Sequence, residues 1–397
     1  MSHLILEFMK KNNYIILCCT IVFALFAASC SERHEIPNLN YVREELFVSD
    51  QQQFQFMDTT DYFLEILCSL SLPSKIKYLQ CDKIEYVNGY FYILDVERNN
   101  TILVFDSVGN YISQIGQRGR ASNEYIDNPT NFCVNPENNQ VMVYERNAHR
   151  IHTFNQNGKQ VKLQTLKLWP YDVGTLFNGN YVGAFDYKEA GKGLQLGVFD
   201  KEENITLPVL NLDETHVFLH NERTFRTVGQ QLYHIPNFSD SVLVFKEDTL
   251  YKVVHLNFQS PFITQEIIHE TNGGNLDRYH KFEGITSISN YYETDNYITF
   301  MYTYNNLQIK CIINKQNNKQ CSFASAPFKG LFPGHNYIID GENILWLITE
   351  DDIVDLKYAL QYDAVQKELA QTHSLIRDII NEKYALPVIL RIKTNWL

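Results

Sequence analysis

A two-strand pattern that returns at nearly constant intervals constrains the fold of this chain more than any other feature of its sequence. In each copy an apolar strand is followed by a polar turn and a second apolar strand, which ends in Phe before the next turn. The marker residues are Phe105, Phe154, Phe199 and Phe245, separated by 49, 45 and 46 positions. Apolar and polar residues alternate with a period of two within these segments, which indicates strands rather than helices.

The copies predict a β-propeller. A four-stranded unit that repeats roughly every 40–50 residues is typical of a propeller blade, because one blade cannot bury both of its faces and radial stacking covers them. Two less regular copies occupy residues 296–323 and the stretch from 336 onward. We therefore expect an all-β fold, a six-bladed β-propeller of four-stranded antiparallel blades, over residues 46–397.

The last blade is expected to contain a helical insertion and to take one strand from the other end of the chain. Apolar residues recur at three-to-four spacing over about 353–383, which predicts helix, and a final strand follows at 384–393. The segment 62–70 reads YFLEILCSL. We expect it to complete the last blade, so that the ring closes without a free edge.

The N-terminus has the layout of an export signal. Lys10 and Lys11 precede an apolar run over residues 14–28, which ends in FAASC at Cys30. This ending resembles the lipobox of bacterial lipoproteins, in which the Cys is acylated, although Ala27 stands where Leu is usual. We expect a lipoprotein signal peptide at 1–29 and a tether at 30–45. The alternative is an ordinary cleaved signal with an incidental Cys30.

Charge and cysteine usage exclude some classes of partner. The net charge is −12 and the body of the chain has no dense basic run, which argues against nucleic acid and leaves the N-terminal lipid as the membrane contact. The cysteines outside the signal form no CxxC pair, so no metal knuckle is indicated. Whether Cys311 and Cys321, which flank one turn, form a disulfide stays open.

The second copy, residues 115–159, resembles an NHL-type repeat. Its landmarks are Gly116, Gly119, Pro129, Val134, Val143, Glu145, Arg150, Ile151, Phe154 and Gly158. With the lipobox, the chain resembles the six-bladed propeller lipoproteins of gut-dwelling Gram-negative anaerobes, over about residues 75–395. It departs where that family has a Gly-Pro-Gly-Glu run and keeps only Glu124 and Tyr125. The resemblance implies the fold and an outer-membrane location, periplasmic or cell-surface facing, and little chemistry.

Two stretches contain candidate ligand-binding residues. Arg118 and Arg120, in the loop that also contains Glu124 and Tyr125, have the spacing to clamp a carboxylate or sulfate; the alternative is a solvated turn. Trp169 and Tyr171 are candidates for stacking on a sugar, and padding between blades is the alternative.

Other polar residues are assigned to structure. Asp95, Glu145 and Asp186 recur at one position in three copies, where capping a turn amide is the expected role. His216 and His220 lack a third ligand.

No catalytic motif, metal ligand set or cofactor site is identified. We expect an exported, lipid-anchored binding or scaffolding module at the outer membrane, with a glycan, peptide or protein ligand, and favour this over an enzyme. The alternative is a hydrolase or lyase that uses the central channel of an NHL-like propeller. A third interpretation is a structural subunit that docks through the helix expected at about 355–383.

Overall fold

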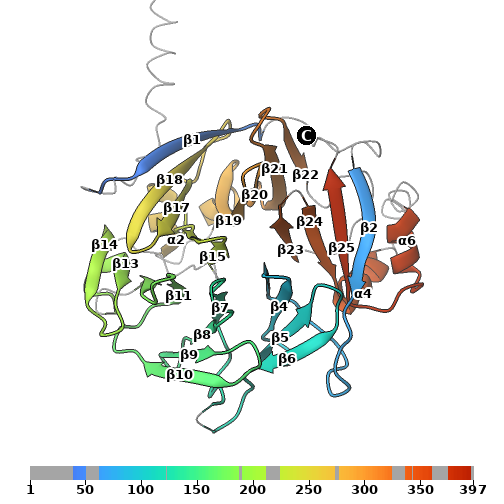
Figure 1. The fold of residues 1–397 in the computed structure, drawn as a ribbon. Helices are drawn as coiled ribbons and strands as arrows, with labels where there is room; N and C mark the ends of the chain where they lie inside the picture. The colour runs from blue at the N-terminus through green and yellow to red at the C-terminus, as the bar shows by residue number, and fades with distance from the viewer. Residues whose placement is uncertain are drawn as a thin grey trace, which may run out of the picture.

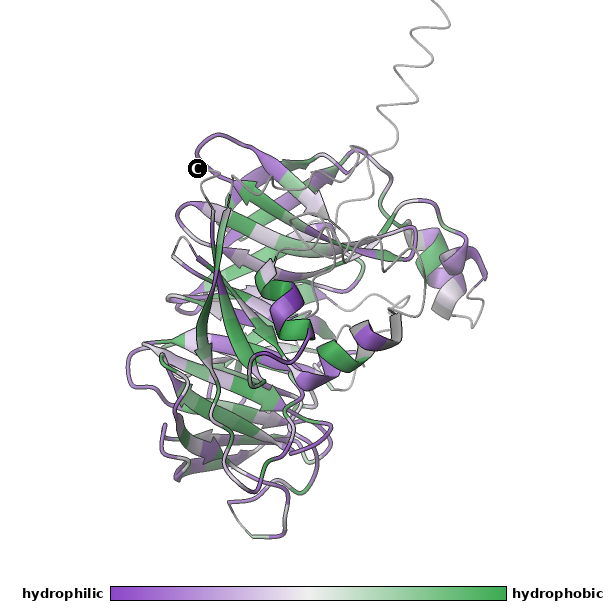
Figure 2. Ribbon diagram, turned by 90° about the vertical axis from the view of Figure 1, so that its right-hand side faces the viewer, coloured by the Kyte–Doolittle hydropathy of each residue, from purple (hydrophilic) through white to green (hydrophobic). Residues whose placement is uncertain are grey.

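Six β-sheets stand radially around one axis, which confirms the six-bladed propeller (Figure 1). In the side view of Figure 2 the hydrophobic residues concentrate in the stacked sheets. No helix among the described residues has the length and apolar character needed to span a bilayer. The computed structural model describes residues 39–50, 62–121, 123–186, 190–211, 224–272, 277–323, 336–341, 343–359 and 374–394.

The first three blades each consist of four consecutive antiparallel strands, ordered from the axis outward. Blade 1 contains β3 (Lys83–Val87), β4 (Tyr90–Asp95), β5 (Thr101–Asp106) and β6 (Tyr111–Ile115). Blade 2 contains β7 (Asn131–Val134), β8 (Val141–Glu145), β9 (Arg150–Phe154) and β10 (Gln160–Thr165). Blade 3 contains β11 (Asp172–Thr175), β12 (Tyr181–Ala184), β13 (Leu194–Phe199) and β14 (Ile205–Asn211).

The other three blades keep this core and differ at their edges. Blade 4 contains β15 (Phe225–Val228), β16 (Gln231–His234), β17 (Ser241–Lys246), β18 (Thr249–Phe258) and an additional outer strand, β1 (Val42–Val48). Blade 5 contains β19 (Ile285–Glu293), β20 (Tyr297–Tyr304), β21 (Leu307–Asn314) and β22 (Gln320–Phe323). Blade 6 contains β23 (Asn336–Asp340), β24 (Asn343–Ile348), β25 (Val388–Thr394) and β2 (Tyr62–Ser69).

Strand β2 closes the ring as expected. It pairs antiparallel with β25, from Tyr62 opposite Thr394 to Ser69 opposite Val388. Blade 6 thus combines a strand that precedes blade 1 with the last strand of the described chain, so the ring closes through backbone hydrogen bonds.

Strand β1 was not expected. It begins at Val42 and pairs in parallel with β18 up to Val48 opposite Phe258. Residues 42–45, which the sequence analysis gave to the tether, are therefore part of blade 4. The segment VREELFV has little alternation of apolar and polar residues, so its sequence does not predict a strand. It forms a strand because it pairs with β18. Cys30 and the signal segment lie outside the described residues.

The helices belong to two insertions. Helices α4 (Glu350–Ala359) and α6 (Ser374–Ile380) lie between β24 and β25, in the region expected to be helical. Helices α2 (Gln265–Asn272) and α3 (Asp277–His280) lie between β18 and β19 and were not expected.

The two ends of the propeller differ in the connections that they carry. Strands alternate in direction within each blade. The connections between consecutive blades therefore lie at the same end of the propeller as the hairpins between second and third strands, and both helical insertions lie at this end. We call this end the loop face. The opposite end, the turn face, carries the hairpins between first and second and between third and fourth strands.

Cys311 and Cys321 are free and buried. The register places Cys311 opposite Ser322 and Cys321 opposite Ile312. Neighbouring positions of a pleated sheet point to opposite faces, so this register holds the two thiols apart and no disulfide forms.

Candidate ligand cleft at the loop face

The innermost strands meet at a buried lysine. Lys83, the first residue of β3, has no exposed surface. Its ammonium pairs with Glu85 at 2.8 Å and donates to the carbonyl of Phe132 in blade 2 at 2.5 Å. It also donates to the carbonyl of Phe225 in blade 4, at 3.2 Å. One side chain of blade 1 thus reaches two other blades.

A chain of hydrogen bonds continues from this lysine around the axis. Asn131 accepts from Lys83 at 2.9 Å and donates to Asp172 in blade 3 at 2.7 Å. The other oxygen of Asp172 accepts from the backbone N–H and the hydroxyl of Thr224, at 2.6 and 3.0 Å. Burial raises the pKa of Asp172, while the hydrogen bonds from Asn131 and Thr224 and the charge of Lys83 act to lower it.

This axial network fills the centre of the propeller at the level of Lys83, because its members bond to one another and are buried. Neither Lys83 nor Asn131 was expected from the sequence. The available signal was a charged or amide residue at the start of an otherwise apolar innermost strand.

An open cleft lies beside the axis, between blade 6 and blade 1, with a volume of about 570 Å³. Its residues come from the connection into blade 1, the β4–β5 hairpin, β23 and the start of α4. They are Gln80, Cys81, Asp82, Arg98, Asn336, Thr349, Asp351, Asp352 and Val354.

The start of α4 presents two of the carboxylates. Thr349 precedes the helix and Asp352 lies three residues later, the spacing of a capping box. Asp352 accepts from the Thr349 backbone N–H and hydroxyl, both at 2.8 Å. Asp351 pairs with Arg98 of blade 1 at 2.5 Å, and the Arg98 guanidinium lies 5.7 Å from the centre of the Tyr78 ring.

The floor of the cleft joins the two blades directly. Asn336 of β23 donates to the carbonyl of Cys81 at 2.7 Å, and Asp82 accepts from the backbone N–H of Val96 at 2.7 Å. Burial and the nearby Asp352 and Asp82 raise the pKa of the Cys81 thiol, so it stays protonated at neutral pH. These contacts hold the polar side chains in place before any ligand arrives.

A buried lysine adds positive charge near the cleft. Lys310 of β21 is 2% exposed, and its ammonium lies 4.9 Å from the centre of the Trp346 ring. Burial lowers the pKa of Lys310 to about 8, although the charge of Asp352 acts to raise it. Three carboxylates therefore line the cleft together with Arg98, and the Lys310 ammonium lies near them. The cleft offers hydrogen-bond donors and acceptors in a small space, with one carboxylate more than the two cations neutralise.

None of the six binding residues expected from the sequence lines this cleft. Arg118 and Arg120 are exposed in the connection between blades 1 and 2. Glu124 accepts from the Ala121 backbone N–H at 2.8 Å and from Gln117 at 2.7 Å. Those hydrogen bonds lower the pKa of Glu124 and fold the loop on itself.

Tyr125, expected from the sequence as a candidate binding residue, is a core residue instead. It has no exposed surface, and its hydroxyl donates to the carbonyl of Ile115 at 2.9 Å. Its ring packs edge-on against His152 at 5.3 Å. Gly116, with a positive φ of 66°, leaves the space that the tyrosine ring occupies.

Of the aromatic pair, only Trp169 faces solvent. Trp169 is 57% exposed and stacks on His149 at 5.1 Å, whereas Tyr171 is 4% exposed in the core between blades 2 and 3. The alternative of padding between blades is therefore correct for Tyr171.

Two of the three recurring carboxylates, Asp95 and Glu145, bind backbone amides as expected. Asp95 accepts from the backbone N–H of Arg98 at 2.9 Å and from that of Gln80 at 3.0 Å. Glu145 accepts in the same way from Asp127 at 2.5 Å, across the connection into blade 2. Asp186 instead pairs with Arg146 at 3.3 Å. His216 and His220 lie outside the described residues. Among the residues that the structure describes, no three His, Cys, Asp or Glu side chains form a group able to hold a metal.

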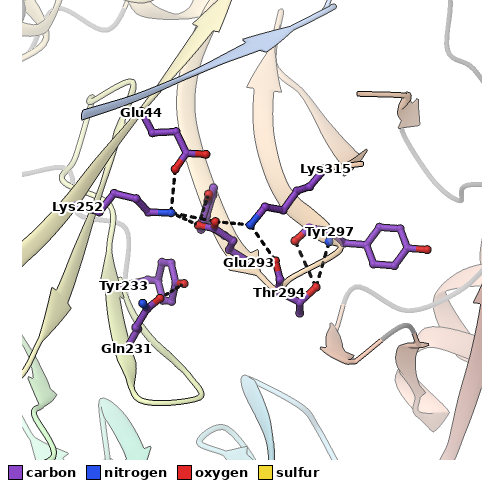
Figure 3. Close-up of polar contacts among 9 residues, drawn as sticks. Glu44, Gln231, Tyr233, Lys252, Glu293, Thr294, Tyr297 and Lys315 are labelled. Carbon is purple, nitrogen blue, oxygen red and sulfur yellow. Dashed lines mark hydrogen bonds and ion pairs between the residues drawn. The ribbon is translucent and has the colours of Figure 1, made fainter. Parts of the chain in front are cut away.

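A second polar cluster lies near the turn face between blades 4 and 5 (Figure 3). Lys252 lies between Glu293 and Glu44, at 2.7 and 3.0 Å, and Lys315 contacts Glu293 at 2.8 Å. The hydroxyl of Tyr291 adds a hydrogen bond to Glu293 at 3.1 Å. Burial acts to raise the pKa of Glu293, but the two lysines outweigh it and the pKa is lowered. Two carboxylates and two ammonium groups balance, so this cluster is structural and attaches β1 to the ring.

The fold and the cleft define a class: a six-bladed propeller with its axis filled and a polar cleft beside it. The chain belongs to the family described as "Domain of unknown function (DUF4934)", whose model matches residues 78–379. A search of curated proteins finds no match.

Several solved structures are similar to this chain, to different degrees. A Bacteroides fragilis NCTC 9343 protein named "Putative exported protein" is 14% identical, with a TM-score of 0.69 over 89% of this chain and 99% of that one. A member of the DUF4221 family from Bacteroides vulgatus ATCC 8482 is 10% identical, with a TM-score of 0.49 over 84% and 99%. Virginiamycin B lyase from Staphylococcus aureus is 14% identical, with a TM-score of 0.40 over 72% and 82%.

Proposed function

We propose that this protein is an exported, lipid-anchored binding module of the outer membrane, and that its ligand is an uncharged saccharide held in the cleft between blades 6 and 1. The observation that carries the proposal is the lining of that cleft. Carboxylates, amides, a guanidinium and a hydroxyl converge in about 570 Å³, with Val354 as the apolar exception. Ligand sites have this size, and clustered donors and acceptors suit a molecule covered in hydroxyl groups.

The charge of the cleft favours a neutral ligand. Asp82, Asp351 and Asp352 oppose an anion, whereas Arg98 and the neighbouring Lys310 reduce the attraction for a cation. Existing hydrogen bonds orient the carboxylates, so a sugar would bind with little loss of side-chain entropy.

Calorimetric titration of the purified protein with neutral oligosaccharides, uronates and lysine-rich peptides tests the ligand class. We expect a neutral saccharide to bind and Asp351→Asn to weaken it about tenfold, which corresponds to about 1.4 kcal/mol. Asp295→Asn, at an exposed turn on the opposite face, is the matched control. Preferential binding of uronates or peptides, or equal effects of the two variants, would contradict the saccharide assignment.

The location has its own test. The export signal and Cys30 support a lipid anchor, and the name "Putative exported protein" of the similar Bacteroides fragilis structure is consistent with export. We expect a labelled fatty acid to be incorporated in cells and Cys30→Ser to abolish incorporation. Release of the unmodified protein with the native Cys30 into the soluble fraction would contradict the anchor.

The alternative, a hydrolase or lyase that works inside the central channel, has less support. The axial network around Lys83 occupies the space that a substrate would need at that level.

A further inference from the structure

A second cleft lies on the turn face, between blades 2 and 3, with a volume of about 350 Å³. The segments that form it lie at the turn face: the hairpins β7–β8, β11–β12 and β13–β14, the end of β9 and the start of β10. Its apolar lining includes Val134, Met142, Val161, Leu176, Phe177 and Tyr181. The volume is near the lower end of the range for small-molecule sites.

Two lysines line the same cleft, Lys162 at the start of β10 and Lys201 in the β13–β14 hairpin. Within the described ranges neither ammonium group forms an ion pair with a carboxylate. Burial and the charge of Lys201 lower the pKa of Lys162, while Glu202 acts in the opposite direction. The like charges therefore approach each other closely enough to interact.

A single glutamine holds this arrangement together. The side-chain oxygen of Gln164 accepts from Lys162 at 2.9 Å and from the Tyr181 hydroxyl at 3.3 Å. Its amide donates to the backbone carbonyl of Lys201 at 2.8 Å. Gly179 lies against the Lys201 side chain, where a β-carbon would come within 3.0 Å of it. Gln164 thus links the Lys162 ammonium and the Tyr181 hydroxyl to the backbone of Lys201.

We propose that this cleft binds a small amphipathic anion, with an apolar ring system or short acyl chain in the cleft and one carboxylate or sulfonate between Lys162 and Lys201. Burial of the apolar part of the ligand against the apolar wall removes apolar surface from water, which favours binding. The two lysines, which form no ion pair with a carboxylate in the described part of the chain, supply the charge complementary to the anionic group. A neutral amphiphile lacks the second interaction and a hydrophilic anion lacks the first. The site is on the opposite face from the saccharide cleft and does not depend on it.

Paired fluorescent probes test the proposal in the purified protein. The anion 8-anilino-1-naphthalenesulfonate and the uncharged N-phenyl-1-naphthylamine share an aromatic body and differ in the sulfonate. We expect Lys162→Gln/Lys201→Gln to weaken the anion at least about tenfold and to leave the neutral probe unchanged. Lys159→Gln, at an exposed turn of the same blade, should change neither. Octanoate should displace the anion more effectively than octanol.

A second variant tests the apolar wall independently of charge. Val161 is 50% exposed, so Val161→Trp is expected to fold and to fill the cleft. It should weaken both probes, with the circular dichroism spectrum unchanged. Equal binding of the anion by wild type and the double lysine variant would overturn the proposal, and so would equal losses of both probes in that variant.

Discussion

Lys83 illustrates what a single charged side chain contributes where the blades meet. It has no exposed surface and bonds to groups from blades 1, 2 and 4. Removing one partner of a buried ionic network leaves the remaining charges buried without compensation. The stability lost in this way is larger than the stability that the intact network adds relative to an apolar core. The axial network therefore connects blades 1 to 4 where they meet at the axis.

Replacement of this lysine should be strongly destabilising. We expect Lys83→Met to lower the free energy of unfolding by about 3–5 kcal/mol, because Glu85 and Asp172 lose their buried cation. Urea denaturation measures the change. Lys77→Met, at an exposed position just before blade 1, should change the value by less than about 0.5 kcal/mol. Similar values for the two variants would show that the axis tolerates an unpaired carboxylate.

His234 should make stability depend on pH. It is 2% exposed, stacks on Phe225 at 4.4 Å, and burial lowers its pKa to about 3. Below its ordinary pKa of 6.5 the unfolded chain binds a proton that the folded protein does not. The contribution of neutral His234 to the free energy of unfolding is therefore fully present above pH 6.5 and is lost as the pH drops toward 3.

The matched comparison is His234→Leu, which removes the titrating group. Between about pH 7.5 and pH 5 the wild type should lose about 2 kcal/mol more than the variant, measured by urea denaturation at each pH. Parallel curves for the two proteins would mean that His234 binds a proton as readily in the folded protein as in the unfolded chain.

At the scale of elements, β1 shows how a strand without a clear sequence signal is held. It pairs with β18 along its whole length, and Glu44 joins it to Lys252 (Figure 3). Lys252 also contacts Glu293, which is 8% exposed, so blades 4 and 5 and the added strand share one group of charges.

The two carboxylates of this cluster should contribute unequally to the free energy of unfolding. We expect Glu293→Gln to lower the free energy of unfolding by about 2–4 kcal/mol, because two lysines lose a buried partner. Glu44 is more exposed, so Glu44→Gln should cost less than about 1 kcal/mol.

The pH dependence provides a further check on the cluster. Because the pKa of Glu293 is lowered from 4.5, its contribution is present above about that pH and is lost as the pH falls through the folded pKa. Urea denaturation at neutral and acidic pH measures both effects. A larger loss for Glu44→Gln would contradict the assigned roles.

At the scale of the whole molecule, stability depends on closure of the ring. Blade 6 joins β2 to β25, so the first and last blades of the described chain cannot separate without breaking a sheet. Leu64 of β2 is 6% exposed and faces the core, whereas its neighbour Phe63 is 54% exposed.

These neighbours provide a matched test of closure. Leu64→Asp should destabilise the protein by more than about 3 kcal/mol, because an unpaired charge is buried. It should increase hydrogen exchange in all six blades, since every blade depends on the closed ring. Phe63→Asp should have little effect. Faster exchange in blade 6 alone would indicate that the blades are stable independently.

Sequence alone determined the blade number, the closing strand, the presence of helix in the insertion of the last blade and the capping role of Asp95. Each depends on local regularity: a period of two, a turn at a fixed distance, or a change to helical spacing. The tertiary structure decided that Tyr125 and Tyr171 are buried, that β1 is a strand and where the clefts lie. The contact between Arg98 and Asp351, for example, joins residues 253 positions apart. Such contacts form only when the blades stack around the axis. The alternation of apolar and polar residues within one strand does not show which residues of the next blade will lie against it.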